Sequence, residues 1–120
     1  MASDDFVFTG KVLFTLQGDM IAPRFDLATE VRIVKVEEGK VVEPTRSLLL
    51  PGPSVDELCG LILRENITVL VCGGIENEQY QFLVWKKVKV FDRVIGNIHD
   101  SLRLFLAGRL EVGMVVTTLR

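Results

Sequence analysis

The sequence predicts one α/β domain built on a five-stranded mixed sheet with three helices. The first fifty residues carry strand patterns without a helix, whereas the rest of the chain alternates helices with short strands. Residues 67–71 form an apolar run without alternation, which is typical of a central parallel strand covered by helices on both faces. With 48% hydrophobic residues, the 120-residue chain can bury one core of its own.

Three strands are expected in the first half. Residues 11–16 are rich in β-branched and aromatic side chains and form the first strand. Residues 30–37 and 40–50 flank a turn at Gly39, which predicts an antiparallel hairpin. Because proline cannot donate to a β-ladder, Pro44 places the second arm of this hairpin at an edge of the sheet.

Three helices and two further strands follow. The first helix begins after a Ser-x-x-Glu capping pattern and covers residues 54–64, and the strand 67–71 comes next. A helix over residues 77–87 then leads to the strand 88–91, which makes a right-handed β-α-β unit. Asn97 is a plausible N-cap for the last helix, which ends at Gly108.

These elements, in the order β-β-β-α-β-α-β-α, are most simply joined in the sheet order 3-2-1-4-5, with the first, fourth and fifth strands parallel. The topology changes between the first and fourth strands, and ligands in open α/β sheets bind in the crevice at such a point. The loops at that end are residues 17–28, 72–77 and 92–98. They bring together the candidate binding residues Arg24, Phe25, Cys72, Gly73, Gly74, Asn97 and His99.

The chemistry of these residues suits an anionic or metal-containing ligand. Gly73 and Gly74 can turn backbone N–H groups toward a ligand, and the positive end of the second helix lies just beyond them. Arg24 adds a full positive charge, and His99 is a potential metal ligand. Cys72 adds a soft donor, and the nearby helix N-terminus is expected to lower the pKa of its thiol.

Simpler interpretations stand beside these. A cysteine that ends an apolar strand is often a core residue, and Cys59 lies on the apolar stripe of its helix. Arg24 can pair with Asp26 or Asp19 on the surface, a contact of little energetic value. Phe25 suits a hydrophobic plug better than a stacking platform.

Composition and charge exclude several classes of function. A net charge of −2 without a basic cluster argues against nucleic-acid binding. No segment approaches the roughly 18 continuous apolar residues that span a bilayer, and the acidic start is unlike a signal peptide. We therefore expect a cytoplasmic protein without a membrane partner. Two cysteines are too few for a disulfide framework or a complete tetrahedral metal site.

The catalytic constellations that we sought are missing from the sequence. Residues 11–16 carry no acidic side chain, which two-metal nucleases with this strand order need. His99 and Ser101 are two positions apart on a helix and so point to different sides. Neither P-loop nor Rossmann glycine spacing occurs. We therefore expect a binding protein and not an enzyme.

Four stretches, in order and at fitting intervals, resemble the dinitrogenase iron-molybdenum cofactor biosynthesis proteins of NifX and NifB C-terminal type. They are residues 21–26 (IAPRFD), 33–42 (IVKVEEGKVV), 69–75 (VLVCGGI) and 104–110 (LFLAGRL). The resemblance covers residues 11–110 and implies an RNase-H-like fold without nuclease activity. It also implies that the Pro-Arg-Phe loop and the Cys-Gly-Gly-Ile turn face the ligand.

The function implied by this resemblance is to bind, store or deliver an iron-sulfur or molybdenum-containing cluster. Residues 17–28 contain neither His nor Cys, unlike the first loop of many relatives, so protein ligation would fall on Cys72 and His99. The implied partners are the cluster and cofactor-assembly or iron-sulfur proteins. Residues 1–10 then form an N-terminal extension and residues 111–120 a C-terminal tail.

Two other functions fit the same residues. The shortage of ligands suits a non-catalytic regulatory or protein-interaction module in which the crevice is vestigial. The glycine turn and the helix dipole suit a protein that binds small anions or nucleotide phosphates.

Overall fold

The computed structural model describes residues 7–117, so residues 1–6 of the predicted extension and 118–120 of the predicted tail lie outside the described residues. The elements follow one another as β1 (Gly10–Gln17), β2 (Met20–Ile21), η2 (Phe25–Leu27), β3 (Glu30–Glu37), β4 (Lys40–Leu49), α1 (Val55–Arg64), β5 (Val69–Val71), α2 (Asn77–Trp85), β6 (Lys89–Phe91) and α3 (Ile98–Leu106).

The strands form one mixed sheet in the order β4-β3-β1-β5-β6, which confirms the predicted order and the mixed α/β class. β3 is antiparallel to both β1 and β4, whereas β1, β5 and β6 run parallel. The sequence did not predict β2, a two-residue strand that folds back on β1 with Leu16 opposite Ile21. This short strand starts the chain on its path across the carboxyl end of the sheet.

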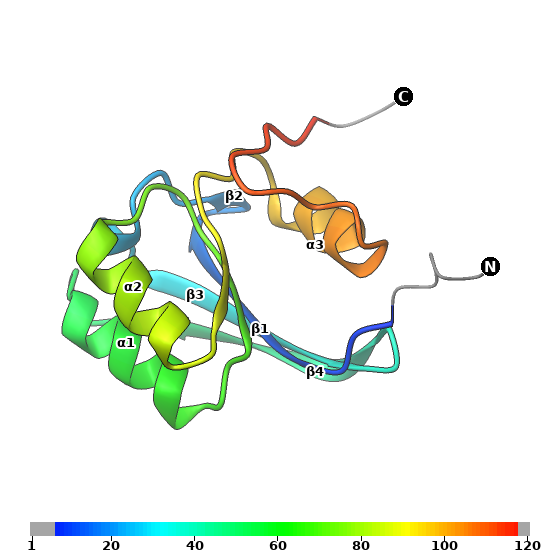
Figure 1. Cartoon of the computed structure of the whole chain (residues 1–120), viewed down its shortest axis with the longest axis horizontal. Helices are drawn as coiled ribbons and strands as arrows, with labels where there is room; N and C mark the ends of the chain where they lie inside the picture. Colours follow the sequence, from blue (N-terminus) through cyan, green and yellow to red (C-terminus); the bar gives the residue numbers. More distant parts are fainter. Residues whose placement is uncertain (1–6, 118–120) are drawn as a thin grey trace.

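The helices cover both faces of the sheet. Figure 1 shows α1 and α2 side by side on one face, with α3 and the C-terminal segment on the other. Leu13 of β1 packs into the core under α1 and α2, whereas its neighbours Val12 and Phe14 pack into the core under α3. Because both faces of the sheet are covered at β5, this central parallel strand is apolar and buried throughout.

The hairpin of β3 and β4 has the expected edge strand. β4 pairs with β3 alone, and the register between them shifts at Ile33 and Lys35. Pro44 lies opposite this shift, after a cis peptide bond from Glu43. Its place in an edge strand is confirmed.

The predicted caps of the first and last helices are confirmed. The Ser54 hydroxyl accepts a hydrogen bond from the backbone N–H of Glu57 (3.1 Å) at the start of α1. α2 ends at Trp85, two residues earlier than predicted, because the chain turns at Lys87, where φ is +71°. That turn directs the chain into β6.

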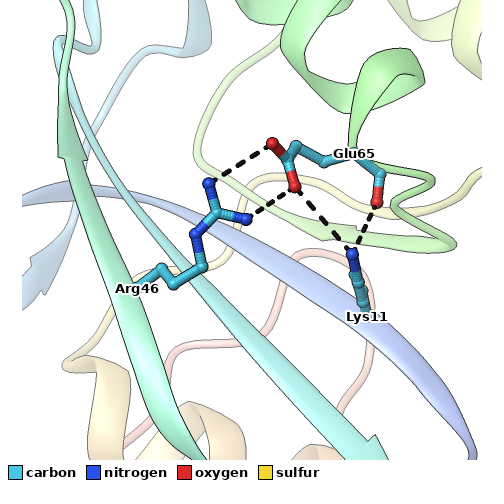
Figure 2. A network of polar contacts seen from close by, with 3 residues as sticks. All are labelled: Lys11, Arg46 and Glu65. Atoms are coloured by element: carbon cyan, nitrogen blue, oxygen red, sulfur yellow. Dashed lines mark hydrogen bonds and ion pairs between the residues drawn. The ribbon is translucent and has the colours of Figure 1, made fainter.

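A polar network joins three elements at the amino end of β1 (Figure 2). The Glu65 carboxylate, just beyond α1, accepts hydrogen bonds from the Arg46 guanidinium of β4 at 2.7 and 3.3 Å. Lys11 of β1 donates to the backbone carbonyl of Glu65 at 3.2 Å and lies 3.9 Å from its carboxylate. The network therefore ties α1 to two strands at the end of the sheet opposite the predicted crevice.

The segment after α3 packs against the sheet, although no strand or helix pattern in its sequence predicts this. The backbone N–H of Ile95 donates to the Met114 carbonyl (3.0 Å), and that of Val116 donates to the Ile95 carbonyl (2.7 Å). Val116 is buried with the core under α3. None of the helices in residues 7–117 has the length and apolar character needed to cross a membrane.

Candidate functional site

The three loops predicted to form the crevice meet at the carboxyl ends of β1, β5 and β6. Met20 of β2 forms a β-bridge with Asn97, just before α3. Next to it, the backbone N–H of Ile21 donates to the Gly96 carbonyl at 2.8 Å. The loop after β1 is therefore joined to the loop after β6, as the topology predicts.

The loop after β5 is joined to the same segment by backbone hydrogen bonds. The Gly74 N–H donates to the Pro23 carbonyl, and the Phe25 N–H donates to the Gly74 carbonyl, both at 2.8 Å. On the other side, the Arg93 N–H donates to the Gly73 carbonyl at 2.9 Å. These backbone hydrogen bonds join the three loops to one another.

A cavity of about 620 Å³ lies among these loops. Its walls are mostly apolar, and its polar side chains are those of Gln17 and Arg93. Met20 and Ile95 are 48% and 59% exposed, so both reach solvent from the wall of the cavity. The ten lining residues are Gln17, Met20, Ile21, Pro23, Gly73, Gly74, Arg93, Val94, Ile95 and Gly96.

Gly73 and Gly74 line the cavity, but they act differently from the prediction. A Cβ atom at Gly73 would overlap the carbonyl oxygens of Ala22 and Pro23, so glycine is required by the close approach of that loop. The N–H of Gly74 is already bonded to Pro23. The expectation that both glycines turn N–H groups toward a ligand is therefore wrong for Gly74.

Cys72 does not line the cavity. Its side chain is fully buried in the core cluster under α1 and α2 that also contains Leu70 and Phe25. Burial, with a smaller effect of the nearby Asp92 carboxylate, raises the pKa of the Cys72 thiol strongly. The predicted lowering of this pKa is wrong, because loss of solvation in the core outweighs any effect of the α2 N-terminus.

Arg24 and Phe25 point to opposite sides of the chain. The Arg24 guanidinium, 57% exposed, pairs with Asp26 through hydrogen bonds of 2.6 and 3.0 Å. This pairing with Arg24 lowers the pKa of the Asp26 carboxyl. Phe25 is fully buried, so it is a hydrophobic plug, and its side chain does not face the crevice as the resemblance implied.

Neither Asn97 nor His99 presents its side chain to the cavity. The Asn97 side chain caps α3: it accepts from the Asp100 N–H (2.8 Å) and donates to the Asp100 carboxylate (2.9 Å). The amide is thus already used by the helix. His99 is exposed in the first turn of α3 and is not among the residues that line the cavity. Across residues 7–117, no group of three or more His, Cys, Asp or Glu side chains could hold a metal ion.

Met20 and Arg93 line the cavity but were not among the candidate residues predicted from the sequence. Met20 lies in the unpredicted strand β2, so no pattern marked it as a wall of the crevice. Arg93 has a φ of +56°, in the left-handed region that favours glycine. An arginine directly after a parallel strand, in a turn that glycine would fit better, was the available signal.

The structure is a small α/β domain with a cavity at the topological switch of its sheet. The chain belongs to the family described as dinitrogenase iron-molybdenum cofactor, whose model matches residues 11–108. The family membership predicted from the sequence is therefore confirmed. No curated protein matches the chain.

Solved structures share this fold at low sequence identity. The crystal structure of PH0822 has a TM-score of 0.74 at 18% identity, covering 85% of this chain and 94% of that one. A candidate dinitrogenase from Methanocaldococcus jannaschii gives 0.71 at 22% identity, covering 87% and 94%. A candidate NifB protein from Thermotoga gives 0.66 at 17% identity, covering 91% and 97%. At such identities these likenesses show the fold alone.

Proposed function

We propose that the protein binds and carries an iron-sulfur or molybdenum-containing cluster in the crevice between β1, β5 and β6, for cofactor storage, delivery or assembly. Membership of the iron-molybdenum cofactor family supports the kind of cargo. The observation that carries the proposal is the cavity of about 620 Å³ at the switch point of the sheet. This volume lies within the range of roughly 300–1,000 Å³ that small-ligand sites occupy.

The side chains of the crevice suit a cluster that is anionic and retains most of its own ligands. The Arg93 Nε donates to the Asp92 carboxylate at 3.1 Å, and the other guanidinium nitrogens are donors for an anion. The Met20 thioether is a soft donor for iron or molybdenum. Apart from Gln17, the remaining walls are apolar. Charge and shape, with few protein ligands, suit a cargo that is bound and then released.

Arg93 is also held at a backbone geometry that costs stability. A non-glycine residue in the left-handed region is less stable by about 1–2 kcal/mol. Such strain often occurs at functional sites, where the side chain is needed for binding. The φ of +56° at Arg93, on the wall of the cavity, therefore supports a contact between its guanidinium and the cargo.

The predicted residues Arg24, Cys72 and His99 are not part of the cavity wall. Arg24 and His99 are exposed but do not line the cavity, so they have no direct role in this proposal. The Cys72 thiol is fully buried in the core, so it becomes a ligand only if the core around it opens.

We further propose that the protein is not a catalyst. None of the ten residues that line the cavity is a nucleophile or a general acid or base. The Asn97 amide beside the crevice is engaged in capping α3. These residues can bind and orient a cargo, but they offer no group that transfers a proton.

Anaerobic reconstitution with iron, sulfide and molybdate tests the carrier proposal. We expect visible absorption and metal that stays with the protein through gel filtration. Arg93→Ala and Met20→Ala should reduce the retained metal, whereas Arg109→Ala, an exposed arginine outside the crevice, should not. If all four proteins retain equal metal, or none, the crevice is not the site.

A pair of substitutions at Arg93 separates binding from stability. Arg93→Gly relieves the backbone strain, so it should unfold no more easily than the wild type, and Arg93→Ala should be less stable than Arg93→Gly. Both should lose retained metal. Normal loading of the Gly variant would show that the guanidinium is not a contact.

A second candidate function is a non-catalytic protein-interaction module. Met20, Ile95 and Val115 are 48%, 59% and 60% exposed, and Ile95 forms a β-bridge with Val115, so apolar side chains border the crevice. Exposed apolar patches often mark protein contacts. A pull-down that recovers the same partner with wild-type, Arg93→Ala and Cys72→Ala proteins, without metal, would favour this function over cluster carriage.

A further inference from the structure

The groove between α1 and α2 lies on the face of the sheet opposite α3 (Figure 1) and is separate from the crevice. It encloses about 400 Å³. Gly60 leaves the middle of its floor without a side chain, since a Cβ there would meet only the Arg64 guanidinium, at 3.5 Å. The lining residues are Val55, Asp56, Cys59, Gly60, Leu63, Glu78, Gln79 and Phe82.

The borders of this groove are apolar and exposed. Leu63 is 38% exposed on α1, and Trp85 is 70% exposed on α2. The Trp85 ring lies 6.3 Å from the ring of Phe82, which lines the groove. A tryptophan this exposed beside an apolar groove is typical of a surface that another protein covers.

The charges along the groove change sign from one end to the other. At the end where both helices begin, Asp56 and Glu78 line it and no basic residue does. At the end where both helices finish, Leu63 also borders a second hollow, of about 230 Å³, which Lys86 and Lys87 line. The surface is therefore acidic at one end, apolar in the middle and basic at the other end.

We propose that this groove is the interface of a two-fold symmetric dimer of this chain. A two-fold axis through the middle of the groove reverses its direction, so the acidic end of each copy meets the basic end of the other. Glu78 of each copy then faces Lys86 of the other copy, which makes two equivalent pairs. A partner of one uniform charge would be repelled at one of the two ends.

The middle of the groove, where the axis passes, contains Cys59. This thiol lies between Asp56 and Leu63 along α1 and is half-buried. In the dimer the two Cys59 thiols lie close together across the axis. Cys72 is the one other cysteine of the chain, and it is fully buried.

Cross-linking tests the position of the axis. A short bis-maleimide should convert the native wild-type protein to a covalent dimer, and Cys59→Ser should abolish that product while Cys72→Ala leaves it unchanged. Sedimentation should show a reversible dimer. A chain that sediments as a monomer up to about 1 mM, where a dimer would have only about −4 kcal/mol of binding free energy, overturns the proposal.

Charge reversal tests the pairing itself. Glu78→Lys and Lys86→Glu should each raise the dimer dissociation constant by about tenfold or more, a factor that corresponds to about 1.4 kcal/mol. Mixing these two variants should restore the dimer as a heterodimer, because both pairs are then opposite in charge. Unchanged dimers in the single variants, or no heterodimer in the mixture, overturn the pairing.

Each variant also places a charge at a helix end where the helix dipole disfavours it. Thermal unfolding of the separate variants at low concentration measures that effect on the monomer. The mixture contains the same two variants, so a weakened helix cannot explain a dimer that returns on mixing.

Discussion

The two ends of the sheet are held together by different kinds of contact. At the amino end of β1, charged side chains of Lys11, Arg46 and Glu65 join the elements (Figure 2). At the carboxyl end, backbone hydrogen bonds and the buried ring of Phe25 fix the loops. Partly exposed ion pairs contribute little, whereas buried packing contributes much. We therefore expect loss of packing at the cavity end to cost more stability than loss of a charge at the opposite end.

The largest expected effect is that of removing the Phe25 ring. Phe25→Ala leaves a cavity in the core under α1 and α2, and substitutions of this kind cost about 3–5 kcal/mol. Chemical denaturation measures this free energy of unfolding. Leu27→Ala is the matched control, since Leu27 lies in the same short helix η2 but is 56% exposed. Equal effects of the two substitutions would contradict the role of Phe25 as the anchor of the loop.

The next effect is steric and concerns two adjacent glycines. Gly73→Ala forces its Cβ into the carbonyl groups of Ala22 and Pro23, and we expect a loss of about 1–3 kcal/mol. Gly74→Ala meets only the Pro23 oxygen, at 3.6 Å, which is an ordinary contact. Thermal unfolding should therefore separate the two variants. A tolerated Gly73→Ala would mean that the loop after β1 can shift.

The fold could be predicted from the sequence because its signals are local and agree with one another. The Ser-x-x-Glu cap, the turn at Gly39 and Pro44 in the edge strand each predict an element that the structure contains. β2 could not be predicted, since two residues carry no periodicity. The packing of Val116 on the sheet depends on contacts distant in the sequence, with Ile95, which no local pattern encodes.

The position of the crevice was predictable for the same reason, but the roles of its residues were not. Topology alone places the loops after β1, β5 and β6 together. Whether Cys72 faces the cavity or the core depends on the face of β5 on which its side chain lies. Its neighbour Leu70 points into the core under α1 and α2, and residue 72 follows it by the two-residue period of a strand.

A smaller effect is expected for the cap at the border of the crevice. Asn97→Ala removes the acceptor for the Asp100 N–H at the start of α3, and such losses are typically about 1 kcal/mol. Asn97→Ser should restore most of the stability, because serine caps about equally well and places no second carboxylate beside Asp100. If Asn97→Ser unfolds as easily as Asn97→Ala, capping is not what this side chain contributes.

The smallest effect is expected at the opposite end of the sheet, where Glu65→Gln removes the charge at the centre of the network. The Glu65 carboxyl is largely covered, but both cations are partly exposed, so we expect a loss of at most about 1 kcal/mol at neutral pH. This loss should shrink further in high salt.

The pH dependence of this stability difference between the wild type and Glu65→Gln tests whether the charge of Glu65 is responsible. The hydrogen bond from Arg46 lowers the pKa of Glu65 below that of a free glutamate, so the folded chain takes up this proton less readily than the unfolded chain. The pair therefore stabilises the fold fully above about pH 4.5, and this contribution is lost as the pH falls through the lowered pKa. The wild type and Glu65→Gln should differ constantly in stability at higher pH and converge in acid. A difference that persists in acid would mean that Glu65 acts through packing and not through its charge, so that the two ends of the sheet would be alike.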